Sequence, residues 1–296
     1  MRHWYLVSAL ASLAFLTIAP APEVAATPAA PARATNLRIL SWNTRHMGWS
    51  GQQNWAGYAA QIWNQFGSTS SSTNGLDVVC LQEVMYDTSV TSLVSALNSV
   101  SGVSWSAATT AALGRSSYKE RYSVLYRTDR VTLLSSTVWT DTGDKFEREP
   151  QIVKLRVNDT SADVTLLNWH TIFGTTAQRQ AEIQEIANVF SSVQASSSTD
   201  QDVILIGDHN AGATSTWWNN LKGLSPAVST PIDMETSINS SCAYVSKYDH
   251  AWYQASYVTE YSSSGRDYVS NVCTFYSGLS DHAPVWLKLY TVGDDD

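Results

Sequence analysis

The sequence has few cysteines and no excess of basic residues, and each shortage excludes a class of protein. Three Cys among 296 residues are too few for a domain held together by a framework of disulfides. The chain has 18 Lys and Arg against 26 Asp and Glu, so its net charge is -8. This balance excludes a protein that covers nucleic-acid phosphates with a strongly basic surface. An acidic chain that acted on DNA would need a local cationic patch, helped by metal ions.

The N-terminal segment has no apolar run long enough to predict a membrane span. A short positive start precedes an apolar, alanine-rich run over residues 4–18, and small residues continue to Ala34. This pattern predicts a signal peptide and an Ala/Pro-rich leader over residues 1–34, with an uncleaved N-terminal anchor as the alternative. We therefore expect a secreted, extracellular protein without stable membrane association, in which cysteines can be oxidised.

Residues 35–296 contain no long linker, repeat or charge block, so we expect them to form a single domain. The 12 Trp, 14 Tyr and many Val and Ile residues exclude disorder for the bulk of the chain, because they can bury apolar surface. Short apolar runs bounded by Gly, Asn, Asp and Ser predict strands. These runs cover residues 37–42, 77–82, 122–127, 131–136, 151–157, 163–169, 202–207 and 283–290.

Three segments have the spacing of amphipathic helices. The clearest covers residues 177–193, where apolar side chains recur at helical intervals after a Gly and two Thr. Residues 54–66 and 88–99 show a weaker pattern of the same kind. Adjacent strands mixed with a few helices predict an α+β fold, a two-sheet β-sandwich flanked by helices.

Polar side chains stand at the ends of most of the predicted strands. Each alone would be interpreted as a turn former or strand cap. Together they can converge on one rim of a sheet, where loops carry chemistry. Carboxylates and an amide favour a hard divalent cation, and two His add acid–base groups. These residues are Asn43, Glu83, His170, Asp208, Asn210, Asp281 and His282.

Several motifs, in this order along the chain, resemble the Mg²⁺-dependent endonuclease/exonuclease/phosphatase superfamily. They are SWN (41–43), LQEV (81–84), NWH (168–170), GDHN (207–210) and SDHAPV (280–285). Longer stretches are similar to the deoxyribonuclease I family within it. They are LGRSSYKERYSVLYR (113–127), FEREPQIVKL (146–155), CAY (242–244) and YDHAWY (248–253). The resemblance extends over residues 36–290 and implies one deoxyribonuclease I-like catalytic domain.

The resemblance implies a centre that hydrolyses phosphodiesters with Mg²⁺ or Mn²⁺. A carboxylate at a strand end is anionic and accepts only, so Glu83 is the best metal ligand. The residues that would hold the metal, or the scissile phosphate beside it, are Glu83, Asn43, Asp208, Asn210 and Asp281.

The resemblance also implies two His–carboxylate pairs, Glu120 with His170 and Asp249 with His282. A carboxylate on one ring nitrogen fixes the orientation of a His and raises its basicity. One His would deprotonate water and the other would protonate the leaving 3′ oxygen, and the sequence does not assign the direction. The residues alone would also allow Glu120 on a solvated strand face and Asp249 as a turn cap.

Three further His are assigned no catalytic role. His209 and His250 stand where the family more often has an aromatic residue and an arginine, respectively. We interpret both as local substitutions. His46 is interpreted as a structural or surface residue.

Cations beside these motifs predict a DNA-binding surface. By resemblance Arg45, Arg115 and Arg148 contact phosphates, and Tyr118 packs against a sugar in the minor groove. Such contacts do not read bases, so we expect cleavage with little sequence specificity.

Other positions limit how strongly this surface binds. Met85 stands where the family has a second minor-groove arginine, which predicts weaker duplex binding or altered site preference. Arg127 and Arg130 are interpreted as solvated charges. With few cationic contacts, affinity should be modest and should fall with salt.

The loop of residues 141–149 resembles a structural Ca²⁺ site of the family. The ligands would be Asp141, Asp144, the carbonyl of Phe146 and Glu149, and the alternative is a plain acidic turn.

The family disulfide next to this chain's GDHN motif cannot form, because residues 211–214 contain no Cys. We expect Cys242 to pair with Cys273 instead and to brace the loop that carries Asp249. Cys80 lies inside an apolar run and is predicted to be a buried thiol.

These features favour a secreted, monomeric, divalent-metal-dependent deoxyribonuclease, an endonuclease that acts on DNA. The alternative is a phospholipid or sugar-phosphate phosphoesterase on the same scaffold, such as a sphingomyelinase-like enzyme. Attack on lipid would need an exposed apolar hairpin, for which Trp217, Trp218 and Trp252 are the candidates. A non-catalytic binding protein is disfavoured, because no expected catalytic position is missing.

Overall fold

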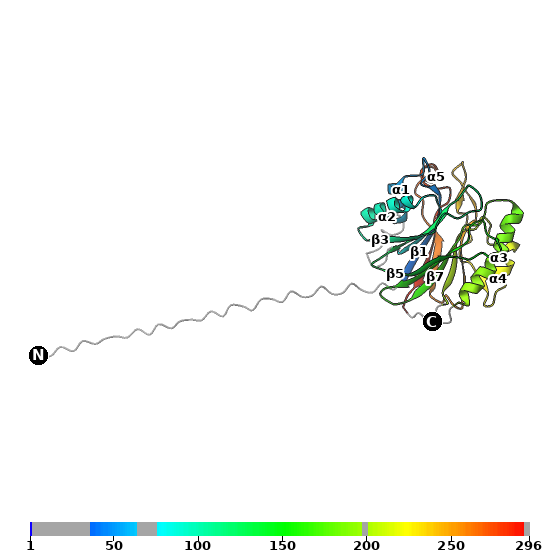
Figure 1. Ribbon diagram of the computed structural model, residues 1–296. Helices are drawn as coiled ribbons and strands as arrows, with labels where there is room; N and C mark the ends of the chain where they lie inside the picture. The colour runs from blue at the N-terminus through cyan, green and yellow to red at the C-terminus, as the bar shows by residue number, and fades with distance from the viewer. Residues whose placement is uncertain (2–35, 64–75, 197–200, 293–296) are drawn as a thin grey trace. The chain divides into compact units, whose positions relative to one another are not determined.

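The structure is a computed structural model that describes residue 1 and residues 36–63, 76–196 and 201–292 (Figure 1). The predicted signal peptide and leader, apart from Met1, lie outside the described residues. The unit discussed below spans Ala32–Asp296. No helix within the described ranges has the length and apolar character needed to cross a membrane.

Within these ranges the chain forms two six-stranded sheets and a small two-stranded one. The first sheet has the order β13 (Tyr261–Arg266), β14 (Val285–Tyr290), β1 (Asn36–Met47), β2 (Val78–Val84), β4 (Arg121–Arg127), β3 (Trp105–Thr109). The second has the order β5 (Val131–Val138), β6 (Gln151–Val157), β7 (Asp163–Asn168), β8 (Val203–Asp208), β12 (Asp249–Gln254), β9 (Val228–Ser229). The small sheet pairs β10 (Ser237–Ile238) with β11 (Tyr244–Ser246).

Helices cover the outer faces of both large sheets (Figure 1). Those on the first sheet are α1 (Trp55–Ile62) and α2 (Asp87–Ser101). Those on the second are α3 (Thr176–Gln194), the 3₁₀ turn η2 (Thr216–Trp218) and α4 (Asn219–Lys222). A fifth helix, α5 (Val272–Gly278), precedes β14.

All three predicted helices are present. A capping box between Thr175 and Gln178 begins α3, because each side chain bonds the backbone N–H of the other. The helix predicted over residues 54–66 is α1, which ends at Ile62; residues 64–66 lie outside the described part.

The core follows from the alternation of side chains along the strands. In β1, Leu37 and Ile39 point into the space between the sheets, whereas Leu40 and Trp42 point toward α1 and α2. In the second sheet, Ile204 and the other inward residues complete the central layer, and the outward residues pack on α3. The predicted α+β sandwich flanked by helices is therefore confirmed.

Arg127 and Arg130 correct one expectation. Both are buried, at 0% and 5% exposure, rather than solvated. Arg130 Nε lies 3.0 Å from Asp77 Oδ1, and Arg127 Nη1 lies 3.8 Å from the same oxygen. The reason is that Asp77, which is 1% exposed, needs positive charge beside it in the interior.

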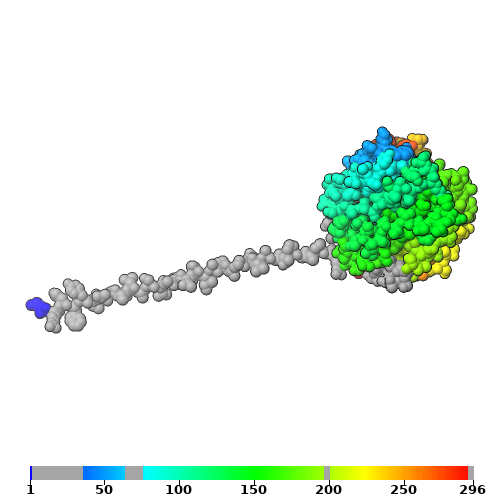
Figure 2. Space-filling view, in the orientation of Figure 1, coloured from blue at the N-terminus to red at the C-terminus, as the bar shows by residue number. Residues whose placement is uncertain are grey.

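The N-terminal and C-terminal parts of this unit lie side by side, as Figures 1 and 2 show. The Tyr58 hydroxyl of α1 donates to the Leu279 carbonyl just after α5 at 2.9 Å. A disulfide joins Cys242 to Cys273 of α5, and Cys80 is a free, buried thiol, as expected.

Strand direction brings the polar strand ends together. β1 runs parallel to β2, and β7 runs parallel to β8, so the carboxyl ends within each pair share one edge. β12 runs antiparallel to β8 and places Asp249 directly opposite Asp208. The loops at this edge form the site described next.

Candidate active site

A pocket of about 780 Å³ opens at this edge of the sandwich, between the two sheets. Its lining includes six of the residues that the sequence predicted for the catalytic centre or the metal, and three of the predicted DNA contacts. The former are Glu83, His170, Asp208, Asn210, Asp281 and His282, with Arg45, Arg148 and Tyr118 as the latter.

The other three candidates, Asn43, Glu120 and Asp249, do not line the pocket and are buried at 1% exposure each.

The first His–carboxylate pair joins the two sheets. His170 follows β7 of the second sheet, and its Nδ1 lies 2.6 Å from Oε1 of Glu120, which precedes β4 of the first sheet. Glu120 also meets Arg148 Nε at 2.5 Å and accepts a hydrogen bond from the Tyr118 hydroxyl at 3.2 Å. These contacts fix the carboxylate and therefore the ring of His170.

The second pair also joins the two sheets, but here the carboxylate belongs to the second sheet and the His to the first. Asp249 begins β12 of the second sheet, and its Oδ2 lies 2.8 Å from Nδ1 of His282, which precedes β14 of the first sheet. The Thr236 hydroxyl donates to the same Oδ2 at 2.5 Å, and Trp42 Nε1 donates to the His282 carbonyl at 2.7 Å. Both the ring and the backbone of His282 are thus held in place.

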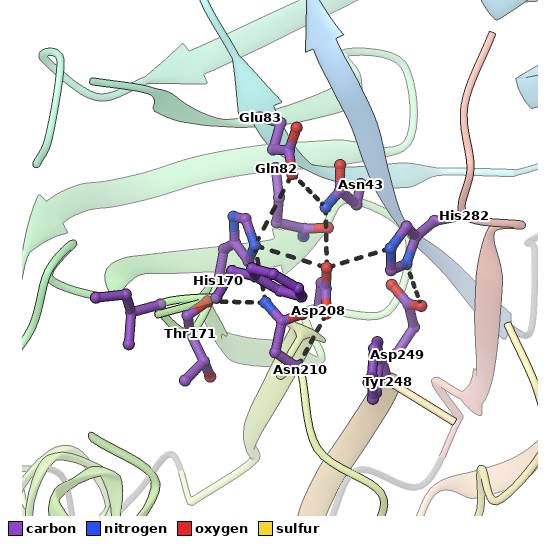
Figure 3. Close-up of polar contacts among 12 residues, drawn as sticks. Asn43, Gln82, Glu83, His170, Thr171, Asp208, Asn210, Tyr248, Asp249 and His282 are labelled. Atoms are coloured by element: carbon purple, nitrogen blue, oxygen red, sulfur yellow. Dashed lines mark hydrogen bonds and ion pairs between the residues drawn. The ribbon is translucent and has the colours of Figure 1, made fainter. Parts of the chain in front are cut away.

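Both imidazoles converge on one carboxylate oxygen (Figure 3). Nε2 of His170 and Nε2 of His282 each lie 3.6 Å from Asp208 Oδ2. Asn210 completes this side, because its Nδ2 lies 3.2 Å from His170 Nε2 and its backbone N–H donates to Asp208 Oδ1 at 3.0 Å. Two acid–base groups therefore face the same carboxylate, that of Asp208.

The carboxylates set the protonation of these rings. Burial alone would lower the pKa of His170, but the Glu120 carboxylate raises it above its ordinary value. Burial opposes the charge on His282 too, yet Asp249 and Asp208 raise its pKa well above the usual range. Burial would raise the pKa of Asp208, and the two His hold it below its usual value. The protonated form of each ring is therefore stabilised by its carboxylate neighbours.

The donor set fits a hard divalent cation. Glu83 Oε1 lies 4.0 Å from His170 Nε2, and Asn43 links Glu83 to Asp208 (Figure 3). Asn43 Nδ2 donates to both Glu83 Oε1 and Asp208 Oδ2 at 2.9 Å, so it holds the two carboxylates near each other. Two carboxylates brought together and facing a pocket are the oxygen ligands that Mg²⁺ and Mn²⁺ prefer. Asp281 lies farther out, with its side chain 39% exposed and its Oδ2 3.8 Å from Arg45 Nε.

A glycine allows β7 and β8 to approach closely at the site. Gly207, just before Asp208, has φ +148, and a Cβ there would lie 1.9 Å from the Trp169 carbonyl oxygen. Trp169 itself precedes His170. Any larger residue at position 207 would therefore push apart the two segments that carry Asp208 and His170.

The family profile described as the Endonuclease/Exonuclease/phosphatase family matches residues 38–282 of this chain. This match extends over most of the chain and includes both His–carboxylate pairs. The chain belongs to the endonuclease/exonuclease/phosphatase family. It is therefore an enzyme of a divalent-metal-dependent hydrolase family.

Members of this family with curated names are similar to the chain at modest identity. A protein named deoxyribonuclease from Thioalkalivibrio sp. (strain K90mix) is 27% identical over 271 residues, which is 85% of this chain and 70% of that protein. Deoxyribonuclease-1 of Equus caballus is 31% identical over 228 residues, or 71% of this chain and 76% of that protein. These relatives support the predicted similarity to deoxyribonuclease I.

Solved structures of the family show the same fold. The crystal structure of an endonuclease/exonuclease/phosphatase from Bacteroides vulgatus superposes with a TM-score of 0.63 at 14% identity. The superposition covers 86% of this chain and 98% of that one. At this identity the similarity concerns the fold alone.

Two of the arginines that were predicted to contact DNA are paired with carboxylates of this chain. Arg148 is 5% exposed and paired with Glu120, and Arg45 Nε faces Asp281 at 3.8 Å. Arg115 does not line the pocket.

Arg115 instead joins the loop that was predicted to bind calcium. Its Nε lies 2.9 Å from Asp144 Oδ1, and its backbone N–H donates to Glu147 at 3.1 Å. Asp141 accepts backbone N–H groups of residues 143, 145 and 146. The Phe146 side chain is buried and Glu149 is half-buried. The loop thus already has positive partners for Asp141 and Asp144, and the calcium site stays a prediction.

Some site residues were missed or assigned elsewhere by sequence reasoning. His46 lines the pocket, and its Nε2 lies 3.2 Å from Glu83 Oε2. Gln82 Nε2 donates to Asn168 Oδ1 at 2.7 Å, which links the two sheets just behind the site. Gln82 and Asn168 lie inside the LQEV and NWH motifs, so their motif positions were an available signal. Thr236 belongs to no motif.

His209 and His250 lie away from the pocket lining. Both are 0% exposed, with ring centroids 5.9 Å apart, and His209 packs edge-on against Trp218 at 5.3 Å. Burial and the neighbouring His250 lower the pKa of His209 well below its usual value. Their positions agree with local substitutions in the interior.

Proposed function

We propose that this chain is a secreted endonuclease that hydrolyses phosphodiester bonds of DNA with Mg²⁺ or Mn²⁺ and with little sequence specificity. The observation that carries the proposal is the convergence of two carboxylate-supported imidazoles on Asp208 Oδ2, each at 3.6 Å. Hydrolysis of a phosphodiester needs one group to take a proton from water and another to give one to the leaving oxygen. Two such groups facing one point meet this need.

In this proposal Glu120 and Asp249 act as positioning residues. Each binds Nδ1 of its His and leaves Nε2 directed into the pocket, at Asp208. One Nε2 would accept the proton of the attacking water, and the other would donate a proton to the 3′ oxygen. Asn210, beside His170 Nε2, would donate to a phosphate oxygen, which stabilises the charge that develops on phosphorus.

Glu83 and Asp208 would hold the cation, with Asn43 keeping the two carboxylates together. Asp281, at the outer edge of the pocket, would complete the set through its exposed carboxylate. A bound divalent cation supplies charge neutralisation at the phosphate. The loop of residues 141–149 would take Ca²⁺ only if Arg115 released Asp144.

DNA as the substrate is supported by the relatives that are named deoxyribonuclease. Contacts from Arg45, Arg115, Arg148 and Tyr118 would go to phosphate and sugar rather than to base edges, which explains the expected low specificity. The Cys242–Cys273 disulfide agrees with an oxidising compartment and so supports export, with residues 1–34 removed. We propose that the mature enzyme is a monomer formed by residues 35–296.

The phospholipid form of the alternative loses the apolar hairpin on which it depended, whereas the sugar-phosphate form needs no such hairpin and is tested by the substrate panel below. Trp218 and Trp252 are 0% exposed, and Trp217 is half-buried. These residues pack against α3 and the second sheet, so they are not available to enter a lipid surface.

A substrate panel tests the proposed function. Plasmid DNA, RNA, sphingomyelin and inositol phosphates are incubated with the enzyme in Mg²⁺, Mn²⁺ or Ca²⁺ separately, and after chelation. We expect nicking of the plasmid with Mg²⁺ or Mn²⁺ and its loss on chelation. Hydrolysis of sphingomyelin or inositol phosphates without plasmid nicking would overturn the proposal in favour of the phosphoesterase.

A further inference from the structure

Positive charge is scarce in the pocket. Among the described residues that line it, Arg45 and Arg148 carry the permanent positive charges. Arg148 is buried against Glu120 at 2.5 Å, and Arg45 faces Asp281 while its Nη1 donates to the Tyr276 carbonyl at 2.6 Å. Because both cations already face carboxylates and only these two line the described part of the pocket, phosphate contacts alone give modest affinity there.

Aromatic side chains, in contrast, are exposed beside the metal candidates. Trp49 is 39% exposed and stacks on His46, with ring centroids 4.3 Å apart and planes 17° apart. Tyr118 lies edge-on to both rings, at 6.0 Å from Trp49 and 5.8 Å from His46. His46 is anchored in turn on Glu83 at 3.2 Å. Because His46 covers one face of the indole, the exposed area of Trp49 lies on its other face and edges.

A second exposed ring lines the pocket itself, whereas Trp49 reaches it through the lining residues His46 and Tyr118. Phe173 follows the His170 segment and is 69% exposed. The guanidinium of Arg179 lies over this ring at 5.5 Å, and Nη1 of Arg179 donates to the Phe173 carbonyl. The phenyl group is therefore supported from the protein side while it stays open to solvent.

We propose that Trp49 and Phe173 are stacking platforms for unpaired bases, and that the enzyme therefore cleaves single-stranded DNA as well as the plasmid duplex. Aromatic rings bind single strands of any sequence, because every base has a π-face. In a duplex those faces are covered by neighbouring bases, so the platforms favour unpaired substrate. This inference rests on the proposed function and names a further form of DNA that the same site takes.

Binding without cleavage tests the platforms. The Kd of fluorescein-labelled oligo(dT) is measured by anisotropy in chelator for the wild type, Trp49→Ala, Trp49→Phe and Phe173→Ala. We expect each alanine variant to bind about 5- to 150-fold more weakly, the range for loss of one stacked base, and Trp49→Phe to retain most of the affinity. Tyr268→Ala removes a ring that is 66% exposed and outside the pocket lining and that, unlike Trp49, stacks on none of the described lining residues, so this variant should bind as the wild type.

Salt dependence separates stacking from charge. With two lining arginines, the slope of log affinity against log salt should be no steeper than about -1.4, at about 0.7 per phosphate contact. Trp49→Ala should lower the affinity and leave this slope unchanged. Wild-type affinity of both alanine variants, or a loss equal to that of Tyr268→Ala, would overturn the platforms.

Cleavage separates this inference from the proposed function. Wild-type enzyme with Mg²⁺ should cut oligo(dT), and Trp49→Ala should raise KM with little change in kcat. Cleavage of duplex but not of oligo(dT) would overturn the inference and leave the proposed function standing. Cleavage of neither would overturn the proposed function and the inference that rests on it. Binding to sphingomyelin vesicles that depends on Trp49, without binding to oligo(dT), would assign the rings to a lipid surface instead.

Discussion

At the scale of single residues, His170 and His282 have the same surroundings. Each meets a carboxylate through Nδ1, at 2.6 Å or 2.8 Å, and faces Asp208 through Nε2. The supporting carboxylates raise the pKa of both rings against the effect of burial. An acid must hold its proton and a base must lose it, so the pH profile of the rate depends on these two values.

Removal of a supporting carboxylate should move one limb of that profile. Asp249→Asn removes a charge that raises the pKa of His282, so this pKa falls. If His282 is the acid, the alkaline limb of kcat/KM moves to lower pH; if it is the base, the acidic limb does. Glu120→Gln should move the other limb in the same direction. An unchanged profile in folded Asp249→Asn would contradict the role of this pair.

Asp77 makes a separate prediction about stability. It is the buried carboxylate that Arg127 and Arg130 share. Asp77→Ala therefore leaves two buried guanidinium groups beside their half-exposed partners, Asp129 and Asp159. We expect a loss of about 3–5 kcal/mol in the free energy of unfolding, measured by urea denaturation.

Asp233→Ala removes one partner of an exposed ion pair, Lys247 with Asp233, and serves as the control that should cost about 1 kcal/mol or less. Equal losses in the two variants would refute this account of Asp77.

Sequence motifs identified which residues form the site, but they did not predict which charged residues are buried. Glu83, His170, Asp208 and His282 follow or precede strands, so strand ends and motif order were enough to bring them together. Arg127 differs, because an arginine on a strand carries no local mark of burial. Its buried partner Asp77 is distant in sequence, whereas its closer carboxylate, Asp129 at 2.7 Å, is 49% exposed.

At the scale of elements, the approach of β7 to β8 positions the site. Gly207 meets the Trp169 carbonyl so closely that no side chain fits between the strands. The Cys242–Cys273 disulfide has a comparable role elsewhere, because it ties the turn before β11 to α5, whose Tyr276 carbonyl binds Arg45. The apolar periodicity of the sequence predicts neither the approach of Gly207 to Trp169 nor the position of the disulfide. Each depends on how segments far apart in sequence pack.

Gly207→Ala should damage activity more than its size suggests. The added methyl would lie 1.9 Å from the Trp169 oxygen, so β8 must shift and Asp208 must move with it. We expect a fall of about 100-fold in the nicking rate, since small displacements of catalytic groups cost this much. Gly51→Ala is the matched control, because its Cβ meets nothing within 4 Å and its φ is also positive. Similar activity in both variants would argue against a close approach at Gly207.

Loss of the disulfide should destabilise the fold. The bridge closes a segment with a sequence separation of 31 residues, for which chain entropy gives about 3–4 kcal/mol. Urea denaturation of Cys242→Ser/Cys273→Ser against the wild type measures the difference. Intact mass with and without reductant checks the bond itself, and two free thiols in the secreted protein would refute the pairing.

At the scale of the whole molecule, each His–carboxylate pair spans the sandwich. The first sheet carries Glu120 and His282, and the second carries His170 and Asp249. Neither pair exists until the sheets pack against each other around the central core. The sequence predicted the two sheets and the pairs, but the crossed arrangement is a property of the assembled fold.

The rate of Mg²⁺-dependent plasmid nicking by His170→Ala and His282→Ala tests the central claim most directly. Circular dichroism and the Tm check that both variants fold, and Asn188→Ala, an exposed α3 position, serves as the control. We predict that each His variant loses about 10²- to 10⁴-fold in rate, as expected for removal of a general acid or base, while the control nicks as the wild type does. Wild-type nicking rates in both His variants would contradict the account.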